Sequence, residues 1–476
     1  MRCDVSSSSV PSSPIGRFKA NEREAARGQT RVSTERSRGR YGPYAATSVV
    51  VANMIGTGVF TSLGFQLLDI QSTFPLLLLW VVGGAAAFCG ALSYAELGAA
   101  IPRSGGEYTF LSRVYHPAAG FVSGCVSATV GFSAPTALAA ITFGTYLASV
   151  FPSLSPTWLG AGLVVAMAAV HVTNHRSSGL LQSGFTTLKV ALIVAFCVAA
   201  ATLADPAQPV ALTPDPGDGT LVFGGAFAVS LIYVSYAYTG WNAATYLTGE
   251  VDDPQRTIPR ILASGTLLVT VLYVALNYAF LRAAPMAELE GRLEVGYVAA
   301  THLFGPAGAA IMGVTLAVLL VSTVSAMVLA GPRVLQVMGE DYPALRRLAR
   351  TKPNGIPAVA VLAQAALTLA FIVTASFETI LVFAGFILGL NSLLTVAGVF
   401  VLRMREPSLA RPYGTWGFPF TPLVYLGLTS WTLVYIALDR PVEALAAAAL
   451  IAGGLLLYRL VRSGRHPPSA ADRPGA

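Results

Sequence analysis

Two short stretches of this sequence place glycine, hydroxyl and aromatic residues inside long apolar runs, where their backbone could bind a charged small molecule. The first contains Gly56-Thr57-Gly58 within residues 49–60, and the second spans residues 234–242. Glycine permits non-helical backbone, so we expect a helix to open at each stretch. An opened helix exposes N–H groups, which favour a carboxylate, and C=O groups, which accept hydrogen bonds from an ammonium. A zwitterionic α-amino acid matches both, although the glycines could instead serve only close helix packing.

Composition indicates that membrane-spanning helices must position these residues. Of the 476 residues, 54% are hydrophobic and 11% are charged, whereas a soluble domain carries about 25% charged residues. A span needs roughly 20 apolar residues, and we predict an all-α integral membrane protein with twelve transmembrane helices. The apolar segments lie at about 43–70, 74–101, 117–150, 156–173, 176–204, 222–248, 258–283, 306–338, 356–376, 378–403, 416–438 and 441–462.

The order of the segments predicts an internal symmetry. The two glycine-containing stretches fall in segments one and six, which indicates a five-plus-five inverted repeat with broken helices 1 and 6. We expect the first repeat over 43–204 (helices 1–5), the second over 222–403 (helices 6–10) and two C-terminal helices over 404–462. Residues 1–42 are predicted to be a disordered basic cytosolic tail, because they are rich in Ser and Arg and contain no apolar run. Residues 463–476 are predicted to be a second cytosolic tail.

The basic residues indicate how the chain is oriented. With the N-terminus in the cytosol, every Lys and Arg lies in a tail or a cytosolic loop except Lys189, Arg282, Arg292 and Arg440. Cytosolic loops carry an excess of Lys and Arg, so we expect a multi-pass cell-membrane protein with both termini cytoplasmic. Lys189 lies inside the fifth segment, where an ionisable group is costly and is a functional candidate by default. The alternative is that its ammonium group reaches the cytosolic interface.

Several stretches make the chain similar to a known family. Gly56-Thr57-Gly58-Val59-Phe60 resembles the first-helix motif of the amino acid-polyamine-organocation (APC) transporters. Further stretches, in family order and with family spacing, resemble the L-type amino acid transporter branch of this superfamily: residues 92–97, 102–108, 236–241 and 250–260. Weaker similarity lies at 331–338 and 411–413. The resemblance covers roughly 43 to 440.

The resemblance implies a substrate site built from both stretches. Backbone N–H groups of residues 57–59 would receive the substrate carboxylate, and carbonyls of both stretches would receive the amine. Tyr236 matches an aromatic gate that family members fold over the substrate, and a flat amphipathic ring suits that role. The alternative is a membrane tyrosine whose hydroxyl bonds to a neighbouring helix. The expected substrate-binding residues are Met54, Ile55, Gly56, Thr57, Gly58, Val59, Tyr236, Tyr238 and Thr239.

Ionisable residues supply candidates for coupling and gating. Lys189 matches a fifth-helix lysine that L-type members place where sodium-coupled relatives hold sodium, which implies sodium-independent transport. Proton carriage by this lysine is a second hypothesis. Glu96 and Glu107 could join Arg103 or Arg113 in an inner gate, or titrate in proton coupling. The competing interpretation is that water solvates both carboxylates at the membrane interface.

Two loops bear on regulation and partners. The charged loop after segment six could form a gating network or simply be solvated; its charged residues are Glu250, Asp252, Asp253, Arg256 and Arg260. The loop at 151–156 contains no cysteine, whereas animal members use one there to bond a glycoprotein heavy chain. We therefore expect a stand-alone, prokaryotic-type member without a disulfide-linked heavy chain.

Other classes of protein are less well supported. His171 and His175 have the i, i+4 spacing of a metal pair, but no acidic ligand or HExxH pattern accompanies them, so we expect neither a metal site nor an enzyme. No GxxxxGK[ST] sequence is present for an ATP-driven pump. A channel would need a continuous polar pathway, whereas the apolar segments of this chain carry few charged residues. No cofactor and no nucleic-acid partner are expected. An amino acid sensor on the same scaffold remains an alternative.

The sequence therefore predicts a permease for α-amino acids that works by alternating access. No fixed acid is evident near the expected site, whose walls include Ser235, Asn242 and Thr323, so neutral substrates are favoured; alanine, serine and leucine stay open. The L-type resemblance favours sodium-independent exchange, as in an antiporter. Proton-coupled symport is the alternative.

Overall fold

The computed structural model describes residues 43–173, 178–203, 205–246, 251, 253–352 and 355–462, and the regular elements within them are helices joined by loops. The two predicted tails lie outside these residues. The prediction of an all-α fold is confirmed. Its physical basis is that backbone N–H and C=O groups in lipid must be satisfied within the segment itself.

Ten helical spans among the described residues are long and apolar enough to cross a membrane. They are Ala46–Gln66, Thr73–Ala100, Pro117–Val150, Pro156–Thr173, Gly184–Thr202, Pro254–Ala283, Val295–Asp341, Phe377–Arg405, Phe420–Asp439 and Pro441–Val461. Two shorter apolar helices, Gly225–Ala237 and Ala358–Thr374, lie where segments six and nine are predicted. The chain is therefore a multi-pass membrane protein.

Several helices in the first half of the chain begin at a glycine or a proline. Its elements are α2 (Pro43–Met54), α3 (Gly58–Gln66), α4 (Thr73–Ala100), α5 (Glu107–Val114), α6 (Pro117–Val126), η1 (Ser127–Ser133), α7 (Ala134–Val150), α8 (Pro156–Thr173) and α9 (Ser178–Thr202). The His116 ring accepts from the Ala118 N–H, and Pro117 occupies the first turn of α6, where its missing N–H costs nothing. The element η1 is a π-helix between α6 and α7, a feature often found at functional sites.

The second half continues the bundle. Its elements are α10 (Asp218–Val222), α11 (Gly225–Ala237), α12 (Ala243–Tyr246), α13 (Pro254–Ala283), α14 (Met286–Leu289), α15 (Val295–Ala330), α16 (Pro332–Asp341), η3 (Pro343–Leu345), α17 (Arg346–Ala349), α18 (Ala358–Thr374), α19 (Phe377–Arg405), α20 (Phe420–Asp439) and α21 (Pro441–Val461). Within α15 the backbone leaves helical geometry at Gly305, with φ 71° and ψ −179°, and Pro306 follows. This kink coincides with the predicted start of segment eight at residue 306.

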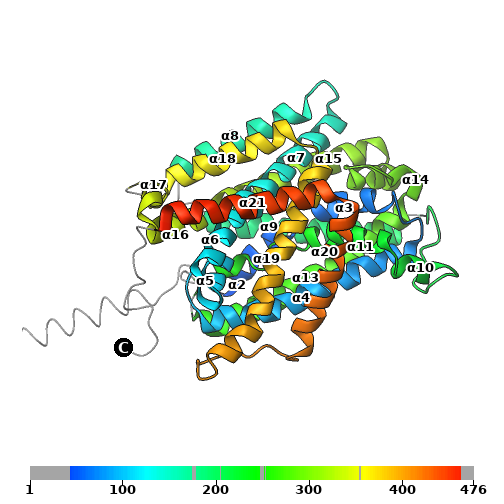
Figure 1. The fold of residues 1–476 in the computed structure, drawn as a ribbon. Coiled ribbons are helices and arrows are strands. Elements are labelled where there is room, and N and C mark those ends of the chain that lie inside the picture. Colours follow the sequence, from blue (N-terminus) through cyan, green and yellow to red (C-terminus); the bar gives the residue numbers. More distant parts are fainter. Residues whose placement is uncertain are drawn as a thin grey trace, which may run out of the picture.

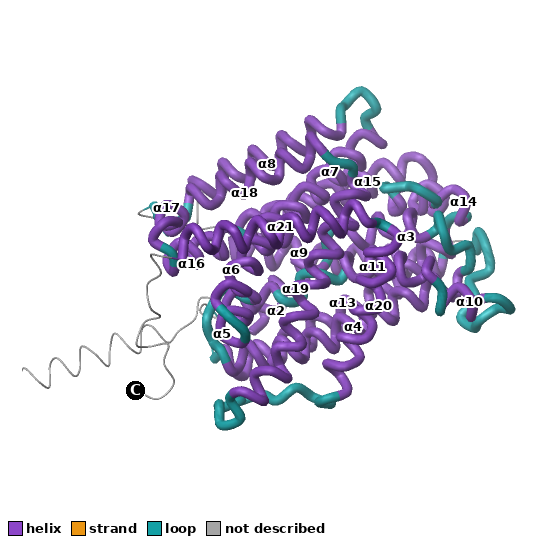
Figure 2. The backbone as a smooth tube through the Cα atoms, in the orientation of Figure 1, coloured by secondary structure: helices purple, strands orange, loops and turns teal. Residues whose placement is uncertain are grey.

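The long helices run side by side, and the short elements gather at the two ends of the bundle. Figure 1 shows α5, α16 and α17 at one end and α10 and α14 at the other. Figure 2 shows that loops lie mainly at these ends, while the middle of the bundle is helical. Within the bundle, α13 packs against α2, α4 and α9. Ile55 and Thr57 of the connection after α2, and Tyr238 and Trp241 of the connection after α11, are buried inside the bundle.

Candidate functional site

The connection between α2 and α3, residues 55–57, leaves backbone N–H groups without partners. The first N–H of α3 that finds a backbone acceptor is that of Phe60, which donates to Thr57 O at 2.9 Å. The N–H groups of residues 57–59 donate to no acceptor in the described part of the chain. Free N–H groups at a helix start attract anions, because the helix dipole also favours negative charge there. This connection can therefore bind a carboxylate.

The connection between α11 and α12, residues 238–242, turns sharply at Gly240. Its φ of +101° lies in the left-handed region that favours glycine. A Cβ atom at Gly240 would lie 2.7 Å from the backbone C and O atoms of Asn53. The Thr239 N–H and hydroxyl both donate to Tyr236 O, at 2.9 and 2.7 Å. The turn thus brings this connection against the end of α2.

The start of α3 and the end of α11 also touch each other directly. A Cβ atom at Gly58 would lie 2.5 Å from Ala237 Cα and 2.6 Å from Ala237 Cβ. Only glycine permits so close an approach of α3 to α11. At Gly56, in contrast, a Cβ atom would meet its nearest neighbour, Thr323 Cγ2, at an ordinary 3.7 Å. Of these two motif glycines, Gly58 is therefore the one that sets the spacing of α3 and α11.

Tyr273 of α13 links the C-terminal ends of α2 and α11. Its hydroxyl lies 2.5 Å from Met54 O and 3.2 Å from Ala237 O. Met54 O also accepts from the Gly56 N–H at 2.7 Å. The sequence interpretation missed this tyrosine. One feature of the sequence could have pointed to it: a hydroxyl group in the middle of apolar segment seven must find a hydrogen-bond acceptor, because lipid offers none.

Lys189 is buried behind the first connection. Its side chain is 2% exposed, and its Nζ donates to Ile55 O at 3.1 Å and to Thr323 Oγ1 at 2.6 Å. The alternative in which the ammonium group reaches the interface is therefore wrong. No carboxylate pairs with Lys189 among the described residues. The lysine instead joins α9, the first connection and α15 through neutral oxygens.

These bonds leave only some of the expected amine acceptors available. A carbonyl oxygen has two lone pairs, and both Met54 O and Tyr236 O already accept two hydrogen bonds. Ile55 O accepts one, from Lys189. Thr239 O accepts none from the described residues. Ile55 and Thr239 therefore offer the most capacity for an ammonium group.

The two tyrosines expected at the site lie in different surroundings. Tyr236 is buried in an apolar cluster with Val130 of η1 and Ile387 of α19. Tyr238 donates from its hydroxyl to Trp80 O of α4 at 2.9 Å, and its ring tilts against Tyr273 with centroids 5.0 Å apart. Tyr236 thus faces η1 and α19, whereas Tyr238 packs toward α4 and α13.

Two cavities, each of about 60 Å³, adjoin the second connection. They share Thr239, Trp241, Leu388 and Ser392. One continues along Ser235 and Tyr236, and the other reaches Asn53 and Glu107. Ligand pockets usually hold about 300–1,000 Å³, so the helices are closed together here. Glu107 on this wall corrects the expectation that no fixed acid lies near the site.

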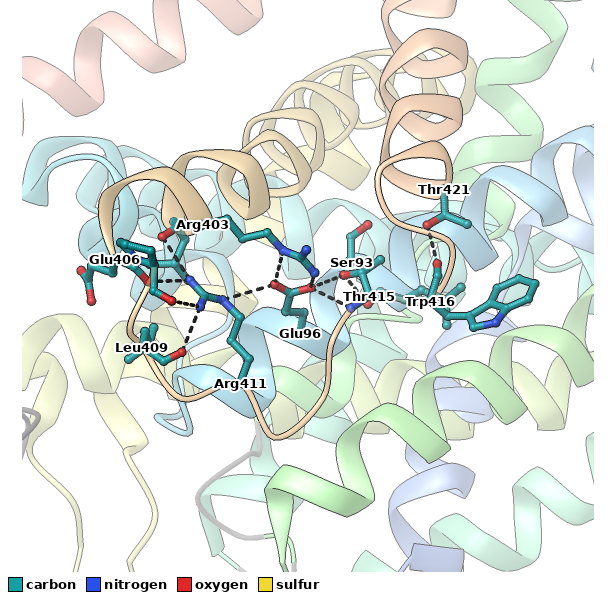
Figure 3. Close-up of polar contacts among 12 residues, drawn as sticks. Ser93, Glu96, Arg403, Glu406, Leu409, Arg411, Thr415, Trp416 and Thr421 are labelled. Atoms are coloured by element: carbon teal, nitrogen blue, oxygen red, sulfur yellow. Dashed lines mark hydrogen bonds and ion pairs between the residues drawn. The ribbon is translucent and has the colours of Figure 1, made fainter.

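At the end of the bundle that carries α5, Glu96 of α4 is the centre of a buried polar cluster (Figure 3). Arg403 at the end of α19 donates to both Glu96 carboxylate oxygens, at 2.8 and 2.7 Å. Arg411 Nε lies 3.6 Å from Glu96, and the Thr415 N–H and hydroxyl donate to it at 2.7 and 2.6 Å. Glu96 therefore holds α4, α19 and the loop before α20 together.

The sequence interpretation of these acids needs correction. Glu96 is 1% exposed and Glu107 is 2% exposed, so neither carboxylate is solvated at an interface. Arg103 and Arg113 pair instead with Asp341 and Glu406, at 2.8 and 2.5 Å. The partners of Glu96 lie more than 300 positions away in the chain, beyond the reach of any local pattern.

At the opposite end, aromatic rings join α3 and α11 to α19, and an ion pair joins α19 to the junction of α20 and α21. The Phe65 ring stacks on Tyr233 and on Phe377, with centroids 5.6 and 5.9 Å apart. The Tyr233 hydroxyl donates to Glu378 at 3.2 Å, and Arg440 donates to the same carboxylate at 2.9 Å. Side-chain contacts thus tie helices together at both ends of the bundle.

The described residues of the charged loop after segment six favour the solvated interpretation over a gating network. Glu250 and Asp252 lie outside the described residues. Asp253 and Arg256 are 3.9 Å apart, with side chains 59% and 79% exposed, and such solvated pairs contribute little to stability. Arg260 is exposed as well.

The structure describes only one histidine of the predicted pair. His171 Nε2 lies 2.9 Å from Ser325 Oγ, and His175 lies outside the described residues. No group of three or more metal-binding side chains occurs in the described part of the chain.

Comparison with known proteins agrees with this architecture. A model of the amino acid permease family matches residues 41–453. The chain is 29% identical to the large neutral amino acids transporter small subunit 2 of Mus musculus over 443 residues, which cover 90% of this chain and 82% of that protein. It is 28% identical to the serine/threonine exchanger SteT of Bacillus subtilis (strain 168) over 386 residues, covering 80% and 86% of the two chains. It is 24% identical to the b(0,+)-type amino acid transporter 1 of Mus musculus over 451 residues, covering 93% and 92%. The chain therefore belongs to the amino acid permease family of the APC superfamily, in its L-type branch, and is an amino acid transporter rather than an enzyme.

Proposed function

We propose that this chain exchanges neutral α-amino acids across the cell membrane without sodium, by alternating access around two broken helices. The observation that carries the proposal is the set of free N–H groups at residues 57–59, beside carbonyls that still have capacity. These groups match the carboxylate and the amine that all α-amino acids share. The exchanger among the relatives supports the mode.

In this proposal the substrate bridges the two connections. Its carboxylate accepts from the N–H groups of residues 57–59, and its amine donates to Ile55 O and Thr239 O. The Tyr236 ring covers the substrate from the side of η1 and α19. Neutral side chains are favoured because Glu107, the acid on the cavity wall, already accepts from three donors. The small cavities require α3, α11 and their neighbours to separate before a substrate enters.

Sodium independence rests on Lys189. Its ammonium group already supplies a positive charge between the first connection and α15, so a metal cation has no need to bind there. The proposed topology has twelve transmembrane helices, an inverted repeat over 43–204 and 222–403, and cytoplasmic termini. The end with α5, α16 and α17 (Figure 1) is then cytosolic, in keeping with Arg346 and Arg347 of α17.

The closure contacts supply candidate gates. Glu96 and its partners hold the cytosolic ends of α4 and α19, and the Phe65 stack closes the outer end. Alternating access requires that contacts at one end loosen while those at the other persist.

The test is uptake of individual radiolabelled amino acids into proteoliposomes that contain the purified protein. The vesicles are empty or preloaded with unlabelled amino acid, with or without sodium, and with or without an inward proton gradient. We expect uptake only into preloaded vesicles. Proton-driven uptake into empty vesicles would instead establish symport, and a sodium requirement would contradict the role of Lys189. Folded protein that binds amino acids but never transports them would favour a sensor.

A further inference from the structure

Six basic side chains gather at the end of the bundle that carries α16 and α17. Four lie in or just after α17 and two lie at the end of α21, and all six are exposed: Arg346, Arg347, Arg350, Lys352, Arg459 and Arg462. We call these six residues the basic platform. The sequence contains no acidic residue between Asp341 and Glu378, or between Glu443 and Asp472. Neighbours in the chain therefore do not balance these charges.

Aromatic packing brings the two basic segments together. The ring of Tyr342, between α16 and η3, lies edge-on to that of Tyr458 in α21, with centroids 6.3 Å apart. Both rings pack on Phe121 of α6, with centroids 5.0 and 5.7 Å away. Val461 at the end of α21 joins the same apolar cluster as Leu345 of η3. Figure 1 shows the end of α21 at the side of the bundle that carries α16 and α17, so the six charges share one surface.

The segment that carries α17 is packed against its neighbours. A Cβ atom at Gly339 of α16 would lie 2.6 Å from the backbone N of Ala349 and 2.8 Å from Leu345 O, so only glycine permits this approach of α16 to α17. Lys352 Nζ donates to Val172 O of α8 at 3.2 Å, which uses one of the three donors of its ammonium group. The platform is therefore a fixed surface, and a ligand need not order it on binding.

The charges of the platform are not neutralised within the described part of the chain. None of its six residues forms an ion pair there. Two acids end the adjoining α16. Asp341 is paired with Arg103 at 2.8 Å and also accepts from the Tyr108 hydroxyl. Glu340 accepts from Gln336 at 3.1 Å and is the single acid left on α16 to offset six basic residues.

The platform lies at the ends of two membrane-spanning segments. Its α17 part follows the span Val295–Asp341, and Arg459 lies in the last turn of the span Pro441–Val461. Clusters of Lys and Arg directly beyond a transmembrane helix attract anionic lipids of the adjacent leaflet. The surface of α21 next to the platform is apolar, since Leu456 and Leu460 are 60% and 69% exposed. Positive charge thus adjoins an apolar surface, which matches a ligand with an anionic head and an apolar tail.

We infer that the basic platform binds the phosphate group of an anionic phospholipid whose acyl chains lie along α21. Guanidinium groups present their N–H donors in a fork that matches phosphate oxygens, and five of the six residues are arginines. A zwitterionic phospholipid carries the same phosphate, but its ammonium group cancels the charge. The place of this site in the cytosolic leaflet rests on the proposed topology, whereas lipid binding itself does not depend on transport.

The experiment is native mass spectrometry of the detergent-purified full chain, titrated with dioleoylphosphatidylglycerol or with dioleoylphosphatidylcholine. We expect the Kd of the first bound lipid to be at least about fivefold lower for the glycerol lipid, the effect of one basic residue near an anionic lipid. This preference should shrink when ammonium acetate rises from about 0.1 M to about 1 M, because the Debye length falls from about 10 Å to about 3 Å. Equal Kd values for the two lipids overturn the inference.

Variants locate the site on the platform. The double variant Arg346→Gln/Arg347→Gln should lose at least about fivefold in affinity for the glycerol lipid, whereas Arg346→Lys/Arg347→Lys keeps the charge and should lose less. The matched control is Arg256→Gln, which removes an arginine that is 79% exposed and lies 3.9 Å from Asp253, and it should bind as wild type does. Unchanged affinity in Arg346→Gln/Arg347→Gln, or an equal loss in Arg256→Gln, overturns the assignment.

If the variant at α17 does not fold, Arg459→Gln/Arg462→Gln takes its place, because it removes the charges of α21 and should weaken the same binding.

Two competitors identify the source of the negative charge. The deacylated headgroup, glycerophosphoglycerol, should not displace the lipid at equal concentration, because it lacks the chains that contact Leu456 and Leu460. A poly-glutamate peptide should compete only weakly for the same reason. Displacement by the free headgroup would overturn the lipid assignment in favour of a soluble phosphate ligand. Displacement by the peptide at lower concentration than by the lipid itself would overturn it in favour of an acidic protein segment. Transport enters none of these measurements, so their failure leaves the proposed exchange untouched.

Discussion

The substitution Gly58→Ala tests the helix contact on which the proposed site depends. An added Cβ atom would lie 2.5 Å from Ala237 Cα, whereas carbon atoms in contact are about 3.5–4.0 Å apart. Either α3 and α11 separate by about 1 Å, or one of them bends by a similar amount. Overpacking of this kind costs about 1–3 kcal/mol. Because binding constellations must hold their geometry within about 0.5 Å, we also expect Gly58→Ala to lose amino acid binding.

A matched control lies two residues away. A Cβ atom at Gly56 would meet only Thr323 Cγ2 at 3.7 Å and Met54 O at 3.8 Å, so Gly56→Ala should be about as stable as wild type. The assay is thermal unfolding of detergent-purified protein, followed by size-exclusion chromatography of the heated samples. The added variant Ala237→Gly should not rescue Gly58→Ala, because the closest atom is the Ala237 Cα. Equal stability of Gly58→Ala and Gly56→Ala, or full rescue by Ala237→Gly, would refute the reasoning.

Three further substitutions test other contacts. Lys189→Ala removes the charged donor that joins the first connection to α15. Because such bonds contribute about 1.5–3 kcal/mol, we expect the exchange rate to fall at least about tenfold while expression is preserved. Transport at the normal rate would remove this lysine from the mechanism. Tyr273→Phe should raise the Kd for amino acids about 2- to 12-fold, because it removes one neutral hydrogen bond of about 0.5–1.5 kcal/mol. Equilibrium binding of radiolabelled substrate measures the Kd. An unaltered Kd would count against a role of Tyr273 in joining α2 and α11 at the site. Arg403→Met leaves Glu96 with only its weaker partners, so thermal unfolding should show a loss toward the lower end of about 3–5 kcal/mol. Adding Glu96→Gln should restore part of that stability, and no restoration would mean that the ion pair is not the cause.

The sequence by itself determined the class of the molecule. A chain that is 54% hydrophobic and 11% charged must place apolar segments in lipid, where only internally bonded backbone is stable. The motif around Gly58 indicated the APC superfamily, and four further stretches, at 92–97, 102–108, 236–241 and 250–260, indicated its L-type branch. The comparisons with known proteins confirmed both. These properties are local, because hydrophobicity and backbone preference act within a few turns of chain.

Only the tertiary structure decided what each polar group contacts. Glu96 and Glu107 look alike in sequence, yet one is held by arginines and the other by neutral donors. Lys189 meets its acceptors 134 positions away in both directions along the chain. Tyr273 carries no sequence motif at all. These partners are brought together by the packing of distant helices, and the free energy of a buried charge depends on its neighbours in space rather than on its neighbours in the chain.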